Sequence, residues 1–308
     1  MEQTAPEESK IPDIRSDNTE LPTTYAALKA ERELWHMMGL DYRPKEASSA
    51  ILAQLVPSQS IVTRVFRIGP KALTRLKSDC SIDNGKGECN KDSGWISTND
   101  ALSALLWRCI VRARVATTSN LRTRTNSLMY AMDMGNSPVV VPEVADRTAM
   151  ANKRLANIVL YSINRAQVPL LVESASLSNT AHEIRTAMQK YSKSSIVTRA
   201  LQLARAIPDV SALGLVYPTW MEHDVVISCL SRLPLYSVPW GETFGEKENG
   251  VPDVVRWPEG VFEGITFIMP RRRDGSVEVI LTMRISDMGK LGEDAEWNCY
   301  VDDRDLAE

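Results

Sequence analysis

One segment of the chain, residues 224–284, does most to limit the folds that this sequence can adopt. Its apolar runs Val225–Leu230 and Ile265–Met269 are typical of buried strands, and they enclose a long loop rich in Gly and Pro. A third run, Val277–Leu281, follows Arg273-Asp274-Gly275 at the spacing of a β-hairpin turn. The segment therefore predicts strands of a sheet and a loop whose backbone shape glycine and proline dictate.

A helix is predicted upstream, over Trp95–Val115. Thr98 or Asn99 is placed to cap it, and Asp100 falls in the first turn, where the helix dipole favours a carboxylate. Apolar residues then recur at helical spacing, which indicates one buried face. These residues are Leu102, Leu105, Leu106 and Cys109.

The rest of the pattern mixes helices and strands, which indicates an α/β protein. Residues 1–22 are polar and are expected to be disordered. Residues 117–126 are polar and basic, and we take them as an interdomain linker. The further predicted strands are 61–68 and 127–133, and the further predicted helices are 25–40, 70–77, 177–190 and 195–206.

Composition excludes several classes of function. The 308 residues carry a net charge of −3, which argues against a nucleic-acid partner. No apolar run has the length of a membrane span, and the polar, acidic first residues do not read as a secretory signal, so a cytoplasmic location is expected. The five cysteines show no metal-binding spacing. Cys80 and Cys89 flank a Gly-rich loop and could pair, although free thiols are the expectation for an intracellular chain.

Several motifs together resemble the BAHD family of acyl-CoA-dependent acyltransferases, in particular its fungal, trichothecene 3-O-acetyltransferase-like members. The string from Ser97 to Arg108 is similar to the family's S-T-N-D-A-L-x-A-L-x-W-R. Leu233–Tyr236 matches the family's Leu-Pro-(Leu/Ile)-Tyr, and Trp240-Gly241 matches the end of its Asp-Phe-Gly-Trp-Gly loop. Val255–Pro258 and the hairpin follow in the family's order. One departure is Pro239, which stands where the family has Asp.

The resemblance implies a chloramphenicol-acetyltransferase-like α/β fold with two related mixed-sheet domains, of which this chain matches the later part only. Residues 23–116 would form a partial, apparently truncated N-terminal domain, and residues 127–308 the C-terminal domain. A truncated first domain would expose apolar surface on the strand 61–68 and on the helix 95–115. Such exposure would favour association into oligomers or aggregates.

The resemblance also implies a reaction. An acyl group, acetyl in the first instance, would pass from acyl-CoA as co-substrate to a hydroxyl or amine of a small molecule in secondary metabolism. No permanently bound cofactor and no metal are implied, and family members are usually monomeric. Asn157 and Ser228 are candidates to contact acyl-CoA. The sequence is equally consistent with an Asn157 amide that only satisfies the backbone of a turn, and with a Ser228 hydroxyl that is only a satisfied group at the end of a strand. Trp240 and Gly241 are expected to be structural loop residues.

The family's general base, the histidine of a His-x-x-x-Asp motif, has no counterpart in these residues. The three histidines are His36, His182 and His223, and none has an Asp four residues later. His223 precedes Asp224 directly, but adjacent strand side chains point to opposite faces and cannot easily form a dyad. We therefore name no catalytic residue. The alternative hypothesis is a catalytically dead or truncated paralogue that binds a ligand or a partner. Arg271-Arg272-Arg273 could attract CoA phosphates, or could be a solvated turn.

Overall fold

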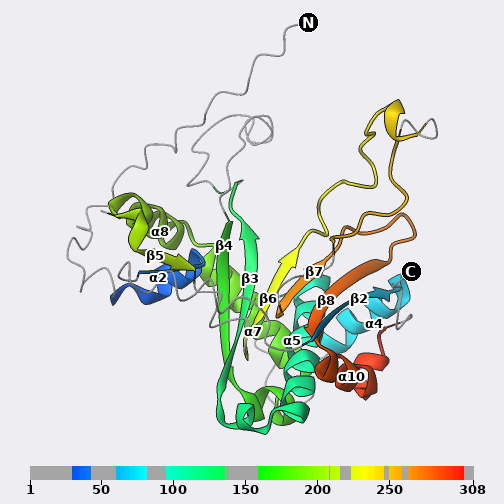
Figure 1. The fold of residues 1–308 in the computed structure, drawn as a ribbon, viewed down its shortest axis with the longest axis horizontal. Coiled ribbons are helices and arrows are strands. Elements are labelled where there is room, and N and C mark those ends of the chain that lie inside the picture. Colours follow the sequence, from blue (N-terminus) through cyan, green and yellow to red (C-terminus); the bar gives the residue numbers. More distant parts are fainter. Residues whose placement is uncertain are drawn as a thin grey trace, which may run out of the picture. The chain divides into compact units, whose positions relative to one another are not determined.

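A computed structural model describes residues 30–42, 60–81, 95–135, 137, 159–207, 209–215, 223–245, 250–258 and 263–301. The chain divides into two compact units. Unit 1 comprises residues 1–53, 131–163 and 188–217, and unit 2 comprises residues 54–130, 164–187 and 218–308. The architecture is mixed α/β, as the alternating pattern of the sequence predicts (Figure 1).

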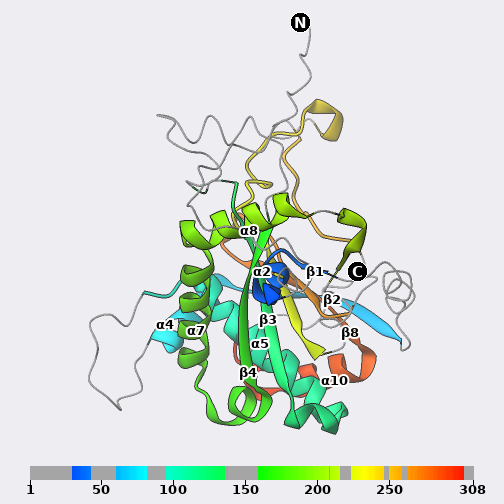
Figure 2. The same cartoon turned by 90° about the vertical axis from the view of Figure 1, so that its left-hand side faces the viewer.

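A six-stranded mixed sheet has the strand order β2-β8-β7-β6-β3-β4. Strands β3, β6 and β7 run parallel to one another, whereas β8 is antiparallel to both of its neighbours. The long strands β3 and β4 lie side by side in both views of the ribbon (Figures 1 and 2). The bounds are β2 Ile61–Ile68, β3 Thr125–Asp133, β4 Val159–Gln167, β6 Val225–Cys229, β7 Ile265–Ile268 and β8 Val277–Arg284.

The hairpin β7–β8 forms where the sequence predicts it. Gly275 has a φ of +83°, a backbone conformation that side chains with a Cβ rarely adopt. Asp274 accepts hydrogen bonds from the backbone and the hydroxyl of Ser276, at 2.9 and 2.6 Å, and it pairs with Arg67 of β2. The turn is therefore fixed both by its own residues and by the neighbouring strand.

The central helix of unit 2 is α5, Thr98–Thr117. Its N-cap is Ser97, and neither Thr98 nor Asn99 caps it as expected. Ser97 and Asp100 form a reciprocal capping box, with N···O distances of 3.1 and 2.6 Å, because a carboxylate at the third helical position can reach back to the N-cap amide. Helices α4 (Pro70–Ser81), α10 (Ile285–Glu293) and α11 (Ala295–Asn298) pack against α5, which also contacts β6.

The expectation that this helix exposes apolar surface is wrong. Leu102, Leu105 and Leu106 are at most 1% exposed, and Trp107 and Cys109 are fully buried. The reason is that α5 has neighbours on several sides, so a helix that reads as one-faced in the sequence is buried almost all round. Strand β2, in contrast, is half-buried over most of its length.

Unit 1 holds α2 (Arg32–Met37), α8 (Ser194–Ala206) and a two-stranded antiparallel sheet of β1 (Leu40–Tyr42) and β5 (Leu213–Leu215). Its core gathers Trp35, Leu203 and Ala212. Remaining elements of the described chain are η2 Ser119–Thr123, the π-helical turn η3 Leu170–Ser174, α7 Leu177–Tyr191, η4 Val210–Ala212 and η5 Glu242–Phe244.

The predicted linker, residues 117–126, comprises the last residue of α5, the turn η2 and the first residues of β3. These residues lie inside unit 2. The predicted division into acyltransferase domains stays a prediction.

Candidate functional site

The carboxyl ends of the parallel strands are the first place to look for a site. In α/β sheets, ligands bind in the crevice outside these ends, where loops rather than paired strands supply the side chains. Strand β6 ends at Cys229, and the register pairs Ile227 with Tyr130 of β3 and Cys229 with Ile268 of β7. The first turn of α5 reaches the same place, because Asn99 contacts the residues that follow β6.

Four side chains from three elements meet at this end of the sheet, and we call them the strand-end cluster: Asn99, Tyr130, Cys229 and Ser231. The Asn99 amide Nδ2 donates to Ser231 Oγ at 3.1 Å, and Ser231 Oγ lies 3.1 Å from Cys229 Sγ. Tyr130 is 5% exposed and hydrogen-bonds Cys229. Burial, and then the neighbouring Cys229, raise the pKa of the Tyr130 hydroxyl well above its usual range.

A buried carboxylate lies beside the cluster. Asp100 is 1% exposed, and its negative charge contributes to the raised pKa of Tyr130. Its Oδ2 accepts from Ser97 N and lies 3.4 Å from Nε of Arg185 on α7. Its Oδ1 has no hydrogen-bond partner among the described residues. Arg185 also stacks over Trp95, with its guanidinium carbon 4.6 Å from the ring centroid.

An extended loop follows the cluster, and we call it the arm: residues 231–258, of which 231–245 and 250–258 are described. Figure 1 shows it running well beyond the ends of β6 and β7, with η5 near its tip. Tyr236 joins its two limbs, because its hydroxyl accepts from Val255 N at 3.0 Å. Gly241 has a φ of +96°, as expected for a loop glycine in a conformation that a Cβ disfavours. A Cβ at Gly250 would lie 2.2 Å from the Gly241 carbonyl oxygen.

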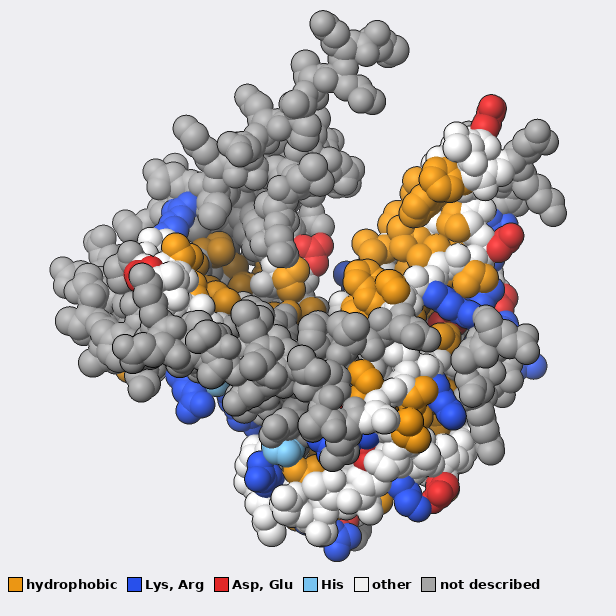
Figure 3. All heavy atoms as spheres, viewed as in Figure 1, with side chains coloured by type: hydrophobic (Ala, Val, Ile, Leu, Met, Phe, Trp, Pro, Cys, Tyr) orange, Lys and Arg blue, Asp and Glu red, His pale blue; other side chains and the backbone are white. Residues whose placement is uncertain are grey.

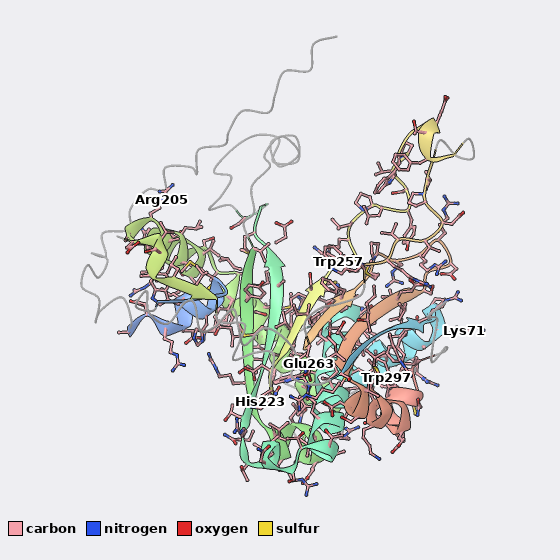
Figure 4. The ribbon with its side chains drawn as sticks, viewed as in Figure 1. Lys71, Arg205, His223, Trp257, Glu263 and Trp297 are labelled. Carbon is pink, nitrogen blue, oxygen red and sulfur yellow. The ribbon has the colours of Figure 1, made fainter. Side chains whose placement is uncertain are left out.

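The returning limb of the arm, residues 250–258, is anchored to the sheet by the buried carboxylate of Glu278. Glu278 of β8 is fully buried and accepts from Arg256 at 3.2 and 3.4 Å and from Arg272 at 2.5 Å. Trp257 stacks on Phe267 of β7 with centroids 4.9 Å apart; Figure 4 labels this tryptophan. The arm is therefore joined to the sheet by a carboxylate–arginine anchor, formed by Glu278 with Arg256.

The residues that the sequence singles out are placed as follows. Ser228 lies on β6, half-buried, one residue before Cys229, so it faces the opposite side of the sheet from the cluster. Asn157 lies outside the described residues. Trp240 is 47% exposed on the arm, where Figure 3 shows hydrophobic side chains gathered. Arg272, one of the three turn arginines, is engaged by Glu278.

The sequence does not mark the cluster residues Tyr130, Cys229 and Ser231 as a site. Their only signal in the sequence is that Cys229 and Ser231 are polar side chains two residues apart at the end of an apolar strand.

None of the histidines belongs to the strand-end cluster. His223 precedes β6 and therefore lies at the amino end of that strand, whereas Cys229 is at its carboxyl end (Figure 4). Its carbonyl oxygen accepts from Arg114 at 3.2 Å. His182 Nδ1 lies 2.9 Å from the Ser178 carbonyl oxygen within α7, and His36 contacts Arg32 within α2.

The amino ends of the parallel strands carry buried charges instead. Arg114 of α5 is 2% exposed, donates to the Asp224 carbonyl at 2.9 Å and lies 3.5 Å from Glu263. Burial raises the pKa of the Asp224 carboxyl to about 6, against the opposing hydrogen bond from Ser127 N. Burial likewise raises the pKa of Glu263, while Arg114 and Arg284 oppose the shift. These contacts tie α5, β3 and β6 together and indicate a structural network.

Two further classes of site find no support in the described part of the chain. No group of three or more His, Cys, Asp or Glu residues there is arranged to hold a metal ion. Within the same residues, every helix is too short or too polar to cross a bilayer.

Residues 43–298 match the transferase family. The chain therefore belongs to this family, and the resemblance to the BAHD acyltransferases is confirmed. Among curated relatives, the O-acyltransferase pigD of Monascus ruber is 27% identical over 257 residues, which cover 82% of this chain and 51% of the relative. The trichothecene 3-O-acetyltransferase of Fusarium sporotrichioides is 25% identical over 237 residues, covering 77% of this chain and 47% of the relative.

Solved structures share the fold. The Fusarium graminearum enzyme of the same kind, in complex with coenzyme A and deoxynivalenol, superposes with a TM-score of 0.64 at 22% identity, over 80% of this chain and 50% of that chain. The Fusarium sporotrichioides enzyme with coenzyme A and T-2 gives a TM-score of 0.63 at 23% identity, over 82% and 53%. The predicted chloramphenicol-acetyltransferase-like fold is confirmed. The chain spans about half the length of the relatives it matches.

Proposed function

We propose that the protein acts in acyl transfer from acyl-CoA, acetyl-CoA in the first instance, to a hydroxyl or amine of a small molecule in secondary metabolism. The observation that supports this most is the family match over residues 43–298. The names of the relatives add to it, because they are fungal O-acyl- and O-acetyltransferases, and two solved relatives hold coenzyme A together with T-2 or deoxynivalenol. The same proposal assigns residues 23–116 and 127–308 to parts of the two family domains.

The chain's contribution is binding and orientation. Holding a thioester and an acceptor in a reactive geometry can supply a large part of a rate enhancement. We propose that Ser228 and Asn157 contact acyl-CoA, while Trp240 and Gly241 shape the arm. A general base is a separate requirement, and no described histidine is a member of the strand-end cluster. The free thiols Cys80, Cys109, Cys229 and Cys299 fit a reducing compartment such as the cytoplasm.

The test is to express residues 1–308 and measure two quantities. Calorimetry should detect CoA binding, and Ser228→Ala should weaken it, whereas Ser286→Ala on the exposed face of α10 should not. Thiol release from acetyl-CoA with a panel of alcohols and amines should stay weak, because a general base contributes about 10²–10⁴-fold. Robust turnover that His36→Ala, His182→Ala or His223→Ala abolishes would show that a base has been misjudged.

A second candidate function is a non-catalytic module that binds a ligand or partner. It is favoured by the absence of His-x-x-x-Asp from these 308 residues. Failure to bind CoA, together with an intact fold by circular dichroism, would favour this second function over the first.

A further inference from the structure

We propose that Cys229 is an acylation site, at which the cysteine sulfur takes the acyl group from an acyl thioester of the CoA class. The inference rests on the proposed function for its donor, but it adds a covalent step and a residue that the family match does not supply. It is carried by the position of Cys229, by the hydroxyl groups on its sulfur and by the buried carboxylate beside them.

Position separates Cys229 from the other described cysteines. It is half-buried at the carboxyl end of β6, where a sheet of this kind receives ligands. Cys80 and Cys109 are fully buried. Burial raises the pKa of the Cys80 thiol to about 12 and that of Cys109 well above its usual range, so both remain thiols at neutral pH. Cys299 is exposed, but it lies just after α11 and not at a strand end.

Two hydroxyl groups lie beside the sulfur. Ser231 Oγ accepts from Asn99 Nδ2 at 3.1 Å and lies 3.1 Å from Cys229 Sγ. An ionised sulfur has no proton to give, so the Ser231 hydroxyl donates to it. The Tyr130 hydroxyl, which also hydrogen-bonds Cys229, likewise can only donate to an ionised sulfur. An attacking sulfur carries negative charge, and hydrogen bonds to a charged atom are stronger than those to a neutral one.

The buried carboxylate is an independent indication of a ligand. Oδ1 of Asp100 is buried without a hydrogen-bond partner among the described residues, and its charge acts on Tyr130. An unmet buried acceptor is unfavourable unless a donor reaches it. The amide N–H groups of the pantetheine chain, which carries the acyl group in CoA, are donors of the required kind.

The chemistry balances without a further reagent. The Cys229 thiol loses its proton to water, and its sulfur attacks the thioester carbonyl carbon. The new carbon–sulfur bond forms, the bond to the CoA sulfur breaks, and the CoA thiolate takes a proton from water. One thioester is exchanged for another, so nothing is oxidised or reduced. A cysteine sulfur is nucleophilic enough to react without a histidine base.

The experiment incubates folded residues 1–308 with acetyl-CoA, and in parallel with S-acetyl-N-acetylcysteamine, and locates the acetyl group by peptide mass spectrometry. We expect a hydroxylamine-sensitive acetyl group on Cys229, lost in Cys229→Ala and retained in the matched control Cys299→Ala. Ser231→Ala and Tyr130→Phe should each slow acetylation about tenfold, the effect of losing one hydrogen bond to a charged group. Circular dichroism of each variant verifies the fold.

The outcomes separate the two proposals. Acetylation at Cys299 alone, or at Cys229 no faster than in the urea-unfolded chain, overturns the inference. CoA binding by calorimetry without acetylation of Cys229 overturns it as well, yet leaves the proposed function standing. Acetylation of Cys229 by the short thioester without any CoA binding supports the site and counts against CoA as the donor.

Discussion

Replacing Glu278 by Ala should destabilise the protein and release the returning limb of the arm. The carboxylate is fully buried and is shared by Arg256 of the arm and Arg272 of the hairpin. Removing it leaves two guanidinium groups facing a cavity in the sheet. Glu278→Gln keeps the shape and one carbonyl acceptor but removes the charge, so its effect should be smaller.

The expected size follows from the exposure of the partners. Removing one member of a buried ion pair typically costs about 3–5 kcal/mol. The side chains of Arg256 and Arg272 remain 30% and 25% exposed, so water can solvate part of the abandoned charge. We therefore expect a loss of about 3 kcal/mol in the free energy of unfolding for Glu278→Ala, and about 2 kcal/mol for Glu278→Gln. The former corresponds to a fall in Tm of roughly 6–12 °C.

Urea unfolding measures the free energy, and limited trypsinolysis reports on the arm. Cleavage after Arg256 should accelerate in Glu278→Ala, because the guanidinium is no longer held against β8. The matched control is Glu242→Ala at the exposed turn η5, which should stay within about 0.5 kcal/mol of the wild type. If Glu278→Ala were as stable as this control, and tryptic cleavage after Arg256 were as slow as in the wild type, Glu278 would not anchor the arm.

Three further predictions concern separate parts of the molecule. Gly241→Val should lower the free energy of unfolding by about 1–3 kcal/mol through backbone strain. Gly250→Ala should lower it further, because its Cβ would also meet the Gly241 carbonyl oxygen. Equal Tm values for both variants and the wild type would contradict this. The Asp224 pKa is raised from 3.8 to about 6 in the fold, so the free energy of unfolding should fall as pH rises from about 4 to 6. Asp224→Asn should flatten this pH profile and stabilise the protein by on the order of 2 kcal/mol at pH 7. A pH profile of urea unfolding that is the same in the variant and the wild type would contradict this. Cys80 and Cys109 should react with iodoacetamide only after unfolding, and rapid labelling of either in the native protein would show that its burial is misjudged.

Local elements of the fold follow well from the sequence. The hairpin at Gly275 and the strands β6 and β7 lie where apolar runs and turn residues predict them, because those signals act between neighbours in the chain. The N-cap of α5 is Ser97, not Thr98 or Asn99. All three are good capping residues, and only the partner three positions later, Asp100, selects Ser97.

The strand-end cluster could not be predicted in the same way. Its members come from α5, β3, β6 and the first residue of the arm, and no local sequence signal indicates that these segments meet. The choice between Ser228 and Cys229 shows the difficulty, because adjacent strand residues face opposite sides and the sequence does not say which side α5 covers. The anchor of the arm was hidden for the same reason, since Glu278 and Arg256 lie on separate segments.

The pairing of β2 with β8 has a consequence for the order in which the protein is made. The two strands are paired over their whole length, from Ile61 with Arg284 to Ile68 with Val277. Within the described sheet β8 is the only neighbour of β2, and the hydrogen bond between Thr63 and Thr282 joins residues 219 positions apart. Synthesis proceeds at roughly 5–20 residues per second, so β8 is made about 10–40 seconds after β2. During that interval the backbone of β2 is unpaired and its apolar residues Val65, Phe66 and Ile68 lack their neighbouring strand. We therefore expect the yield of folded protein in a cell to depend on chaperone capacity, even if the finished sheet is stable.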